Sequence, residues 1–389
     1  MHTVSQLKDG VAALLSGINL NNISNLNPAL ERAARITIQQ ADIPEASGTQ
    51  SIMLYNKVFD YPAPSGIFGG ALTDIQPQGV SRTVNDFVYK QPIELFDRTK
   101  CLLPNGYQVT FQPTNGTPIM RIAQTRAPQA IILDPMNATT GWTASGVATG
   151  LTTDSTVYYQ SPASLRFNLT GTGAGILTKT LANPIDLTTY EGVGVVFLAI
   201  YAPSVSALTN IQVKIGSDSS NYSLVTATAA FLGAFQANEF ALVAFDLANA
   251  TNTGTPDFSA IQYVQVTENV TGAIANFRVG NLFIALPSPH NILYESSAIF
   301  SVNGALSQTI TTDNDIIILN DAAYTLYEHE CALTIALQSG GKLSGPLVQF
   351  LRAILYGSGS DPGLYARYRG DNPSQELRTI GSYYSVNGL

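Results

Sequence analysis

Charged residues, histidine, cysteine and tryptophan are all scarce in this chain of 389 residues. Charged residues make up 12% of the sequence, against roughly 25% in an ordinary soluble domain. The surface is therefore expected to consist largely of Ser, Thr, Asn, Gln and Gly. The 2 cysteines, Cys101 and Cys331, are far apart and belong to no metal-ligand spacing. The sequence predicts no disulfide framework, and assembly in a reducing cytoplasm is the simpler interpretation.

Groups that commonly catalyse reactions are also few. The 3 histidines are His2 at the N-terminus, His290 beside prolines and His329 inside a predicted helix. Glu328 and Glu330 flank His329, but adjacent positions of a helix point apart. No HExxH, Walker or GxSxG motif occurs. We therefore expect no catalytic residue and no cofactor; a glycoside hydrolase, whose two carboxylates need to meet only in space, is an alternative.

The charge balance bears on two classes of partner. The net charge is −8, whereas proteins dedicated to nucleic-acid binding supply phosphate contacts mainly from Lys and Arg. A weakly acidic lumen would repel phosphate, which suits a passage through which DNA slides. The longest apolar run, residues 193–202, is about half a bilayer span, so no membrane partner is expected.

Both ends of the chain show helical periodicity. A first helix is predicted over residues 4–16, and a second begins at Asn27-Pro28, where an N-cap residue precedes proline. Towards the other end, Asn320 or Asp321 caps a predicted helix that runs to about residue 338. Another is predicted from about residue 344 to residue 356, with apolar residues along one face.

The middle of the chain alternates like strands instead. Residues 42–129 contain short apolar runs separated by Pro and Gly, which is typical of extended chain with many turns. Further on, eight segments predict a sandwich or jelly roll, at residues 164–169, 176–181, 193–201, 211–216, 222–226, 240–246, 261–267 and 277–284.

This order predicts an α+β multidomain fold. Because a two-helix fragment buries too little surface to be stable alone, we expect both chain ends to pack together. Residues 1–129 and 289–389 would form one helical domain with an extended β-rich segment and a C-terminal arm. Residues 130–288 would form an all-β sandwich or jelly roll inserted at a loop. Three separate domains in a row are the alternative.

The segments at residues 59–64 (FDYPAP), 313–319 (DNDIIIL), 363–369 (GLYARYR) and 372–375 (NPSQ), together with the opening helices, form a pattern. This pattern resembles neck or head-to-tail adaptor proteins of tailed bacteriophages. The resemblance implies a homo-oligomeric ring beneath the portal, in contact with portal, neck and tail proteins, with DNA as a non-specific cargo in its lumen. It also implies a virion structural protein that assembles in the host cytoplasm.

The segments at residues 141–142 (GW), 164–168 (SLRFN), 184–190 (PIDLTTY), 245–247 (FDL) and 281–284 (NLFI) form a second pattern. It is similar to galactose-binding-like jelly rolls of the carbohydrate-binding-module type. Sugar-binding modules stack an exposed aromatic ring on a pyranose face. The resemblance therefore makes Trp142, Tyr158 and Tyr159 the candidate sugar-binding residues. Packing of Trp142 at the sandwich edge and of the tyrosines within strands is the other interpretation.

Some jelly rolls of this kind also hold a structural calcium ion with carboxylates and backbone oxygens. Asp134, Asp186 and Asp246 are the residues that would serve here. An Asp-Leu pair after a strand is ordinarily a turn or a cap, however, and we expect no metal.

The C-terminal tail is rich in Tyr and Arg, the residue types favoured at the centres of interfaces. The residues predicted to contact a neighbouring subunit or the portal are Arg367, Tyr368, Arg369, Arg378, Tyr383 and Tyr384. A disordered terminus is the other interpretation.

Together these patterns favour a non-enzymatic virion adaptor whose sandwich decorates the particle. One rival hypothesis is a carbohydrate-binding adhesin, or another decoration or tail protein, in which the sandwich is the active part. The other is an enzyme that hydrolyses polysaccharide.

Overall fold

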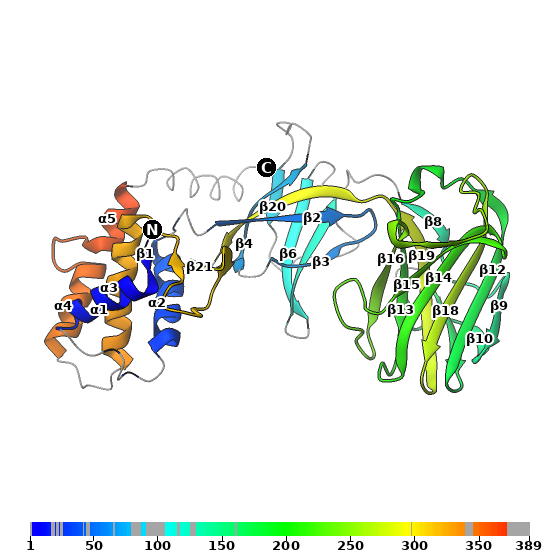
Figure 1. The fold of residues 1–389 in the computed structure, drawn as a ribbon, viewed down its shortest axis with the longest axis horizontal. Coiled ribbons are helices and arrows are strands. Elements are labelled where there is room, and N and C mark those ends of the chain that lie inside the picture. The colour runs from blue at the N-terminus through cyan, green and yellow to red at the C-terminus, as the bar shows by residue number, and fades with distance from the viewer. Residues whose placement is uncertain are drawn as a thin grey trace. The chain divides into compact units, whose positions relative to one another are not determined.

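The chain forms two compact units, described here from a computed structural model (Figure 1). The structure describes residues 2–16, 20, 23, 26–41, 43, 47–64, 67–78, 87–90, 106–114, 117–124, 130–159, 162–296, 298–338 and 345–371. Unit 1 comprises Met1–Gln50, Pro64–Ile75 and Ile292–Leu389, and unit 2 comprises Ser51–Ala63 and Gln76–Asn291. The boundaries expected from the sequence placed all of residues 1–129 with the helices, but residues 51–63 and the described residues between 76 and 129 belong with the sandwich.

Unit 1 is built on helices from both ends of the chain. They are α1 (Val4–Leu14), α2 (Leu26–Ala41), α3 (Asp321–Gln338), α4 (Gly345–Tyr356) and α5 (Gly363–Asp371). Helix α1 starts at a capping box, in which the Thr3 side chain accepts from the Gln6 amide and the Gln6 side chain accepts from the Thr3 amide. A small sheet with the order β1 (His2–Thr3), β23 (Ile316–Ile317), β21 (Phe300–Val302) and β22 (Ala305–Ser307) completes this unit.

Helices from the two chain ends share one hydrophobic core. Leu7 and Leu30 from the N-terminal helices lie in the same buried cluster as Leu326, Tyr327 and Leu351. The Tyr327 hydroxyl donates to the Leu30 carbonyl oxygen over 3.1 Å. Helix α3 lies at the centre, since it packs against α1, α2, α4 and α5. Burial of this apolar surface stabilises helices that would be marginal alone.

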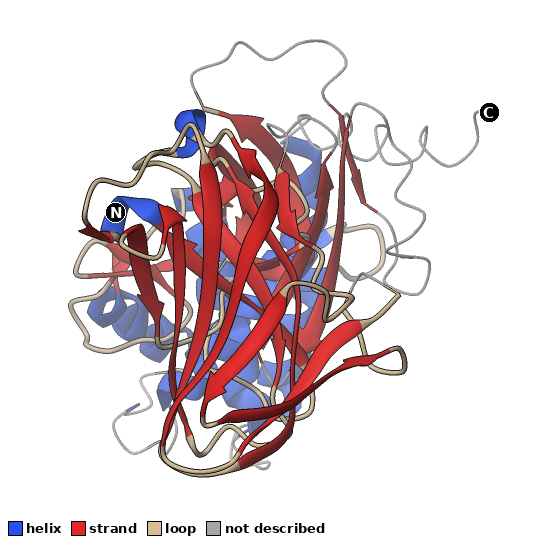
Figure 2. Cartoon of the chain, turned by 90° about the vertical axis from the view of Figure 1, so that its right-hand side faces the viewer, coloured by secondary structure: helices blue, strands red, loops and turns tan. Residues whose placement is uncertain are grey.

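Unit 2 contains the predicted sandwich, which the structure confirms as two antiparallel sheets (Figures 1 and 2). The first sheet has the order β10 (Ala148–Asp154), β11 (Ser164–Leu169), β19 (Ile274–Ala285), β13 (Val195–Tyr201) and β16 (Phe240–Asp246), and β8 (Ile131–Asp134) also pairs with β19. The second has the order β17 (Thr251–Thr253), β15 (Asn221–Ala227), β14 (Leu208–Asp218), β18 (Ile261–Val270), β12 (Gly173–Ile185) and β9 (Trp142–Gly146).

Alternation along each strand explains the core of the sandwich, because successive side chains of a strand point to opposite faces. On β13, Val196, Leu198 and Ile200 point inward and join the core, as Val264 and Val266 do on β18. The intervening residues point outward. Each sheet therefore has an outer face, which these outward-pointing side chains form.

Part of the outer face of the first sheet is covered by an aromatic cluster. Phe197 and Phe283 stack with ring centroids 5.2 Å apart, and Tyr55 contacts Phe197 at 5.0 Å. Tyr61 is fully buried, and its hydroxyl accepts from the Tyr55 amide over 2.8 Å. The segment that follows β2 (Ser47–Leu54) thus seals this part of the sheet against solvent.

Two further sheets contain residues that lie, in the sequence, between the helices and the strands of the sandwich. One has the order β2, β20 (Ser288–Ser296) and β4 (Ile67–Pro77), and the boundary between the two units falls within these three strands. The other has the order β3 (Asp60–Pro62), β7 (Thr117–Gln124), β6 (Gly106–Thr114) and β5 (Phe87–Lys90).

Candidate functional site

The outer face of the second sheet gathers aromatic and polar side chains. On β14, Ile211, Val213 and Ile215 point into the core, so the residues between them point outward. The same alternation applies to β15, β18 and β12. We call the resulting surface the tyrosine face; it consists of Gln212, Lys214, Gly216, Tyr222, Thr226, Tyr263, Gln265 and Thr178.

Two tyrosines lie on either side of a glycine on this face. In register, Gly216 on β14 lies opposite Tyr222 on β15 and Tyr263 on β18. The two rings are half-buried, and their centroids are 6.4 Å apart with planes tilted by 40°. A Cβ at Gly216 would lie 2.6 Å from the Tyr222 Cα, so a larger residue does not fit between the rings.

Polar groups surround the two rings. The Lys214 ammonium lies 4.5 Å from the centroid of the Tyr222 ring, a cation–π distance. A hydrogen bond with Thr253, and then the charge of Lys214, lower the pKa of the Tyr222 hydroxyl, whereas burial raises the pKa of Tyr263. Gln265 Nε2 donates to Thr178 Oγ1 over 3.2 Å.

Hydrogen bonds within the tyrosine face orient the side-chain amides of Gln212 and Gln265 but leave some of their donors and acceptors unused. Gln212 Nε2 donates to Thr226 Oγ1 over 3.2 Å, as Gln265 does to Thr178. Each amide has two N–H groups and a carbonyl oxygen, so these bonds leave donors and acceptors for a ligand. The tyrosine face can therefore offer ring stacking and hydrogen bonds to one flat, hydroxyl-rich molecule.

Trp142, Tyr158 and Tyr159 do not form one sugar-binding surface. Trp142 is only 5% exposed and points into the core from β9, with Nε1 donating to Asp134 Oδ1 over 3.3 Å. The ring therefore packs the sandwich, the alternative interpretation given above. Tyr158 is 47% exposed, and Tyr159 lies against Phe240 at 5.9 Å. Both follow β10 of the other sheet.

The three aspartates considered for calcium have separate local partners. Asp134 pairs with the Lys179 ammonium at 2.6 Å and accepts from the Met136 amide. Asp186 accepts from the Thr188 amide and hydroxyl, and Asp246 caps the turn at Ala248. Within the described ranges, no group of three or more His, Cys, Asp or Glu side chains is placed to hold a metal ion.

The residues predicted to form a C-terminal interface have different surroundings. Tyr368 on α5 is buried in the helical core, so it anchors the helix instead of facing a neighbour. Arg367 and Arg369 are exposed, and Arg367 Nη2 lies 2.8 Å from Asp361 Oδ1. Arg378, Tyr383 and Tyr384 lie outside the described residues.

Sequence reasoning missed Tyr222 and Tyr263. Each lies in a segment predicted as a strand, at a position whose alternation points away from the core. That signal places them on an outer face, but the close approach of the two rings depends on the pairing of both strands with β14.

Among the helices that the structure describes, none has the length and apolar character that crossing a membrane requires.

No family model and no curated protein matches the chain. Several solved structures are similar to it over part of its length. The family 30 carbohydrate-binding module of a cellulosomal cellulase of Clostridium thermocellum is 16% identical, with a TM-score of 0.32, and covers 40% of this chain and 97% of that one. The family 11 carbohydrate-binding module of Clostridium thermocellum, in complex with a β-1,3-1,4-mixed-linked tetrasaccharide, is 13% identical, with a TM-score of 0.30, over 40% of this chain and 95% of that one.

Proposed function

We propose that this chain binds a neutral polysaccharide through the tyrosine face. The observation that carries the proposal is the pair Tyr222 and Tyr263 on either side of Gly216, within a surface of amides and hydroxyls. The sugar rings of such a polysaccharide have apolar C–H faces and hydroxyl edges. Tyrosine rings match the faces, and the side chains of Gln212 and Gln265 match the edges.

The surface offers binding groups and no assembled catalytic pair. Its one ionised side chain, Lys214, is a donor that lies over the Tyr222 ring. Glycoside hydrolysis requires two carboxyl groups across the scissile bond, and the residues that define the tyrosine face include no carboxylate. The proposal is therefore one of binding without cleavage.

Replacing either tyrosine by alanine is expected to weaken binding about tenfold or more, because stacking on an aromatic ring contributes about 1 kcal/mol or more beyond the buried area. Isothermal titration calorimetry of the full chain with a β-1,3-1,4-linked glucan tetrasaccharide measures the effect for Tyr222→Ala and Tyr263→Ala. Emission of Trp142, the only tryptophan, verifies that each variant keeps its core.

Tyr158→Ala is the matched control, because this ring is exposed but follows β10, a strand of the other sheet. It is expected to bind the tetrasaccharide as the unaltered chain does. Loss of binding in Tyr158→Ala, with Tyr222→Ala and Tyr263→Ala unaffected, would contradict the proposed face and support Tyr158 and Tyr159 as the platform.

A second candidate function is that of a structural subunit of a tailed-phage particle, in a neck or adaptor ring. The shared core of the N-terminal and C-terminal helices favours it, because the sandwich is thereby an insertion within one helical unit in the order of the chain. This candidate predicts a homo-oligomer, which light scattering coupled to size-exclusion chromatography detects as a mass several times 41.4 kDa. A chain that stays monomeric and is missing from purified particles would refute it.

A further inference from the structure

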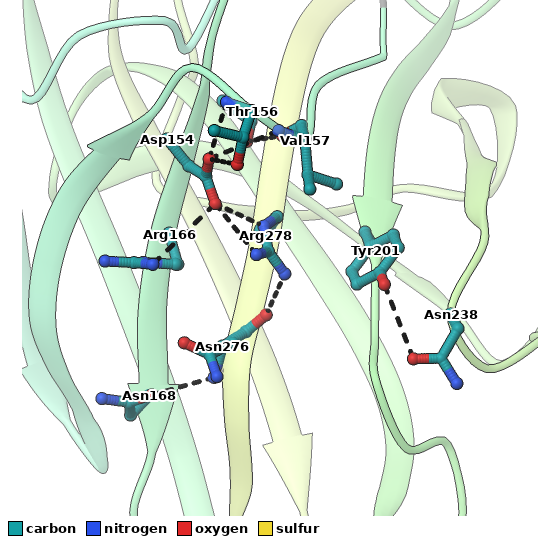
Figure 3. Close-up of polar contacts among 10 residues, drawn as sticks. Asp154, Thr156, Val157, Arg166, Asn168, Tyr201, Asn238, Asn276 and Arg278 are labelled. Carbon is teal, nitrogen blue, oxygen red and sulfur yellow. Dashed lines mark hydrogen bonds and ion pairs between the residues drawn. The ribbon is translucent and has the colours of Figure 1, made fainter.

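A row of side chains crosses the outer face of the first sheet, on the opposite side of the sandwich core from the tyrosine face. In register, Arg166 on β11 lies opposite Arg278 on β19, which lies opposite Tyr201 on β13. Thr152 and Phe240 continue the row onto β10 and β16. We call these five residues the arginine row; Figure 3 shows its two guanidinium groups and Tyr201 on neighbouring strands.

Asp154 holds Arg278 in place. Its Oδ2 lies 2.9 Å from both Nε and Nη2 of Arg278, and Oδ1 accepts from the Thr156 hydroxyl and amide and from the Val157 amide (Figure 3). These hydrogen bonds, first those from Thr156 and then that from Arg278, hold the pKa of the Asp154 carboxyl far below its usual range. Asp154 is therefore ionised and neutralises Arg278 under all ordinary conditions.

Arg278 is nearly saturated by protein partners. Its Nη1 donates to the Asn276 carbonyl oxygen over 2.9 Å, and its guanidinium carbon lies 4.9 Å from the centroid of the Tyr201 ring. Only 11% of its side chain is exposed. Arg278 is thus held in one position by Asp154, Asn276 and Tyr201.

Arg166 differs from Arg278 in exposure and in partners. Its side chain is 41% exposed, and its Nη1 lies 4.0 Å from Asp154 Oδ2, the limit of an ion pair. No hydrogen bond from its guanidinium to another described residue is found. Asp154 already neutralises Arg278, so the three groups together leave one positive charge, and Arg166 presents it to solvent.

Neutral polar groups lie beside this charge. Asn168 Oδ1 accepts from the Asn276 amide over 2.8 Å, which fixes the Asn168 side chain and leaves its two N–H groups as donors. On the other side of Arg278, the Tyr201 hydroxyl donates to Asn238 Oδ1 over 3.5 Å. A ligand on the row would therefore meet one cation with hydroxyl-binding amides on both sides.

We propose that the arginine row binds the carboxylate of a uronic acid residue in an acidic polysaccharide. A planar guanidinium matches a carboxylate in both charge and geometry. The amides of Asn168 and Asn238 would accommodate the hydroxyl groups of the same and adjoining sugars. A single exposed guanidinium on a chain of net charge −8 is too little for a nucleic-acid backbone, which needs several cations. The site is separate from the tyrosine face and does not depend on it.

Calorimetry with trigalacturonate, and with its fully methyl-esterified form, tests the proposal on the full chain. The free acid is expected to bind at low salt and the ester to bind at least tenfold more weakly, since only the acid has the charge that Arg166 recognises. Arg166→Gln is expected to weaken binding of the acid about tenfold. Arg352→Gln removes an exposed charge from α4 and is the matched control, for which no change is expected.

Three results would overturn the proposal: no binding of the acid at about 10 mM, equal binding of acid and ester, or unchanged binding by Arg166→Gln with a native Trp142 emission spectrum. Tyr222→Ala separates the two proposals, because it is expected to bind trigalacturonate normally. If the neutral tetrasaccharide does not bind, the proposal for the tyrosine face fails, but binding of trigalacturonate to the arginine row is still expected.

Discussion

Raising the pH from about 5 to about 9 is expected to lower the contribution of one buried carboxyl group to the free energy of unfolding of the sandwich by about 4 kcal/mol. The cause is Glu268, whose side chain points into the core from β18 and is fully buried. Neither carboxyl oxygen has a hydrogen-bond partner among the described residues. Its neighbours in register are Gly175 on β12 and Ile211 on β14, which offer no charge and no side-chain donor.

The sign follows from the two protonation equilibria. Burial raises the pKa of Glu268 to about 8 in the folded chain, from 4.5 for an ordinary glutamate. Below about pH 4.5 both states hold the proton, and the acid has no effect on the pH dependence of stability. Between about 4.5 and 8 the unfolded chain releases its proton while the folded chain keeps it, so stability falls by up to about 1.4 kcal/mol per pH unit. Above about 8 the loss is complete.

Glu268→Leu tests this prediction, because it removes the acid and leaves a residue that suits an apolar core. Urea unfolding followed by Trp142 emission reports on the sandwich, since this tryptophan is buried in its core. Burial also lowers the pKa of His290, which gives stability the opposite trend below about pH 6.5. The difference between the variant and the unaltered chain cancels that contribution.

The gap in unfolding free energy between Glu268→Leu and the unaltered chain is expected to widen by about 4 kcal/mol between about pH 5 and 9. Glu268→Gln keeps the shape of the side chain and is expected to lose the pH dependence as well, although its buried amide stays unpaired. A gap that is constant across this range would show that Glu268 has the same affinity for protons in both states.

The burial of Glu268 was open to prediction from the sequence, but its lack of a partner was not. Residues 264, 266, 268 and 270 read Val, Val, Glu and Val, and strict alternation places all four on one face. Whether a donor faces the carboxyl depends on the strands on either side, and the structure places Gly175 and Ile211 there. Alternation within a strand is local information, whereas pairing between strands is not.

The same distinction explains which elements could be predicted. The four predicted helices and the eight predicted strands of the sandwich follow from periodicity, and the structure places each within a few residues of its expected bounds, whereas β8, β9, β10 and β17 were not predicted. Trp142 was a candidate for a sugar site because aromatic rings often stack on sugars, with packing at the sandwich edge as the alternative. The ring is buried in the sandwich core, where Asp134 and Lys179 also contact it, and the sequence does not reveal these contacts. The tyrosine face and the arginine row likewise depend on register between strands that are far apart in the chain.

Helix α5 is a further element that its own sequence does not indicate. Residues 363–371 show no apolar face, yet Tyr365 and Tyr368 are buried in the helical core. Tyr365 is held there by Glu330 of α3, which is 2% exposed and accepts from the hydroxyl of Tyr365 over 3.0 Å and from that of Tyr356 over 3.1 Å. One buried carboxylate thus connects α3, α4 and α5.

Tyr365→Phe is accordingly expected to lower the free energy of unfolding of the helical unit by about 2 kcal/mol, because it removes a hydrogen bond to a buried carboxyl group. Tyr356→Phe is the matched control. Its hydroxyl donates to the same oxygen, but this tyrosine is 49% exposed, so water can replace the lost donor and the expected cost is smaller. Circular dichroism at 222 nm during urea unfolding measures both variants through their helices.

Tyr365→Phe should also change the pH dependence of that transition. Burial raises the pKa of Glu330, and the two tyrosine hydroxyls oppose this rise by donating to the carboxylate. Without the Tyr365 hydroxyl the pKa of Glu330 rises further, so stability falls more steeply as the pH increases above the ordinary glutamate pKa. A uniform loss at every pH would instead indicate that the Tyr365 hydroxyl stabilises the ionised and the protonated forms of Glu330 equally, and no loss at any pH would indicate that Tyr365 contributes by the packing of its ring alone.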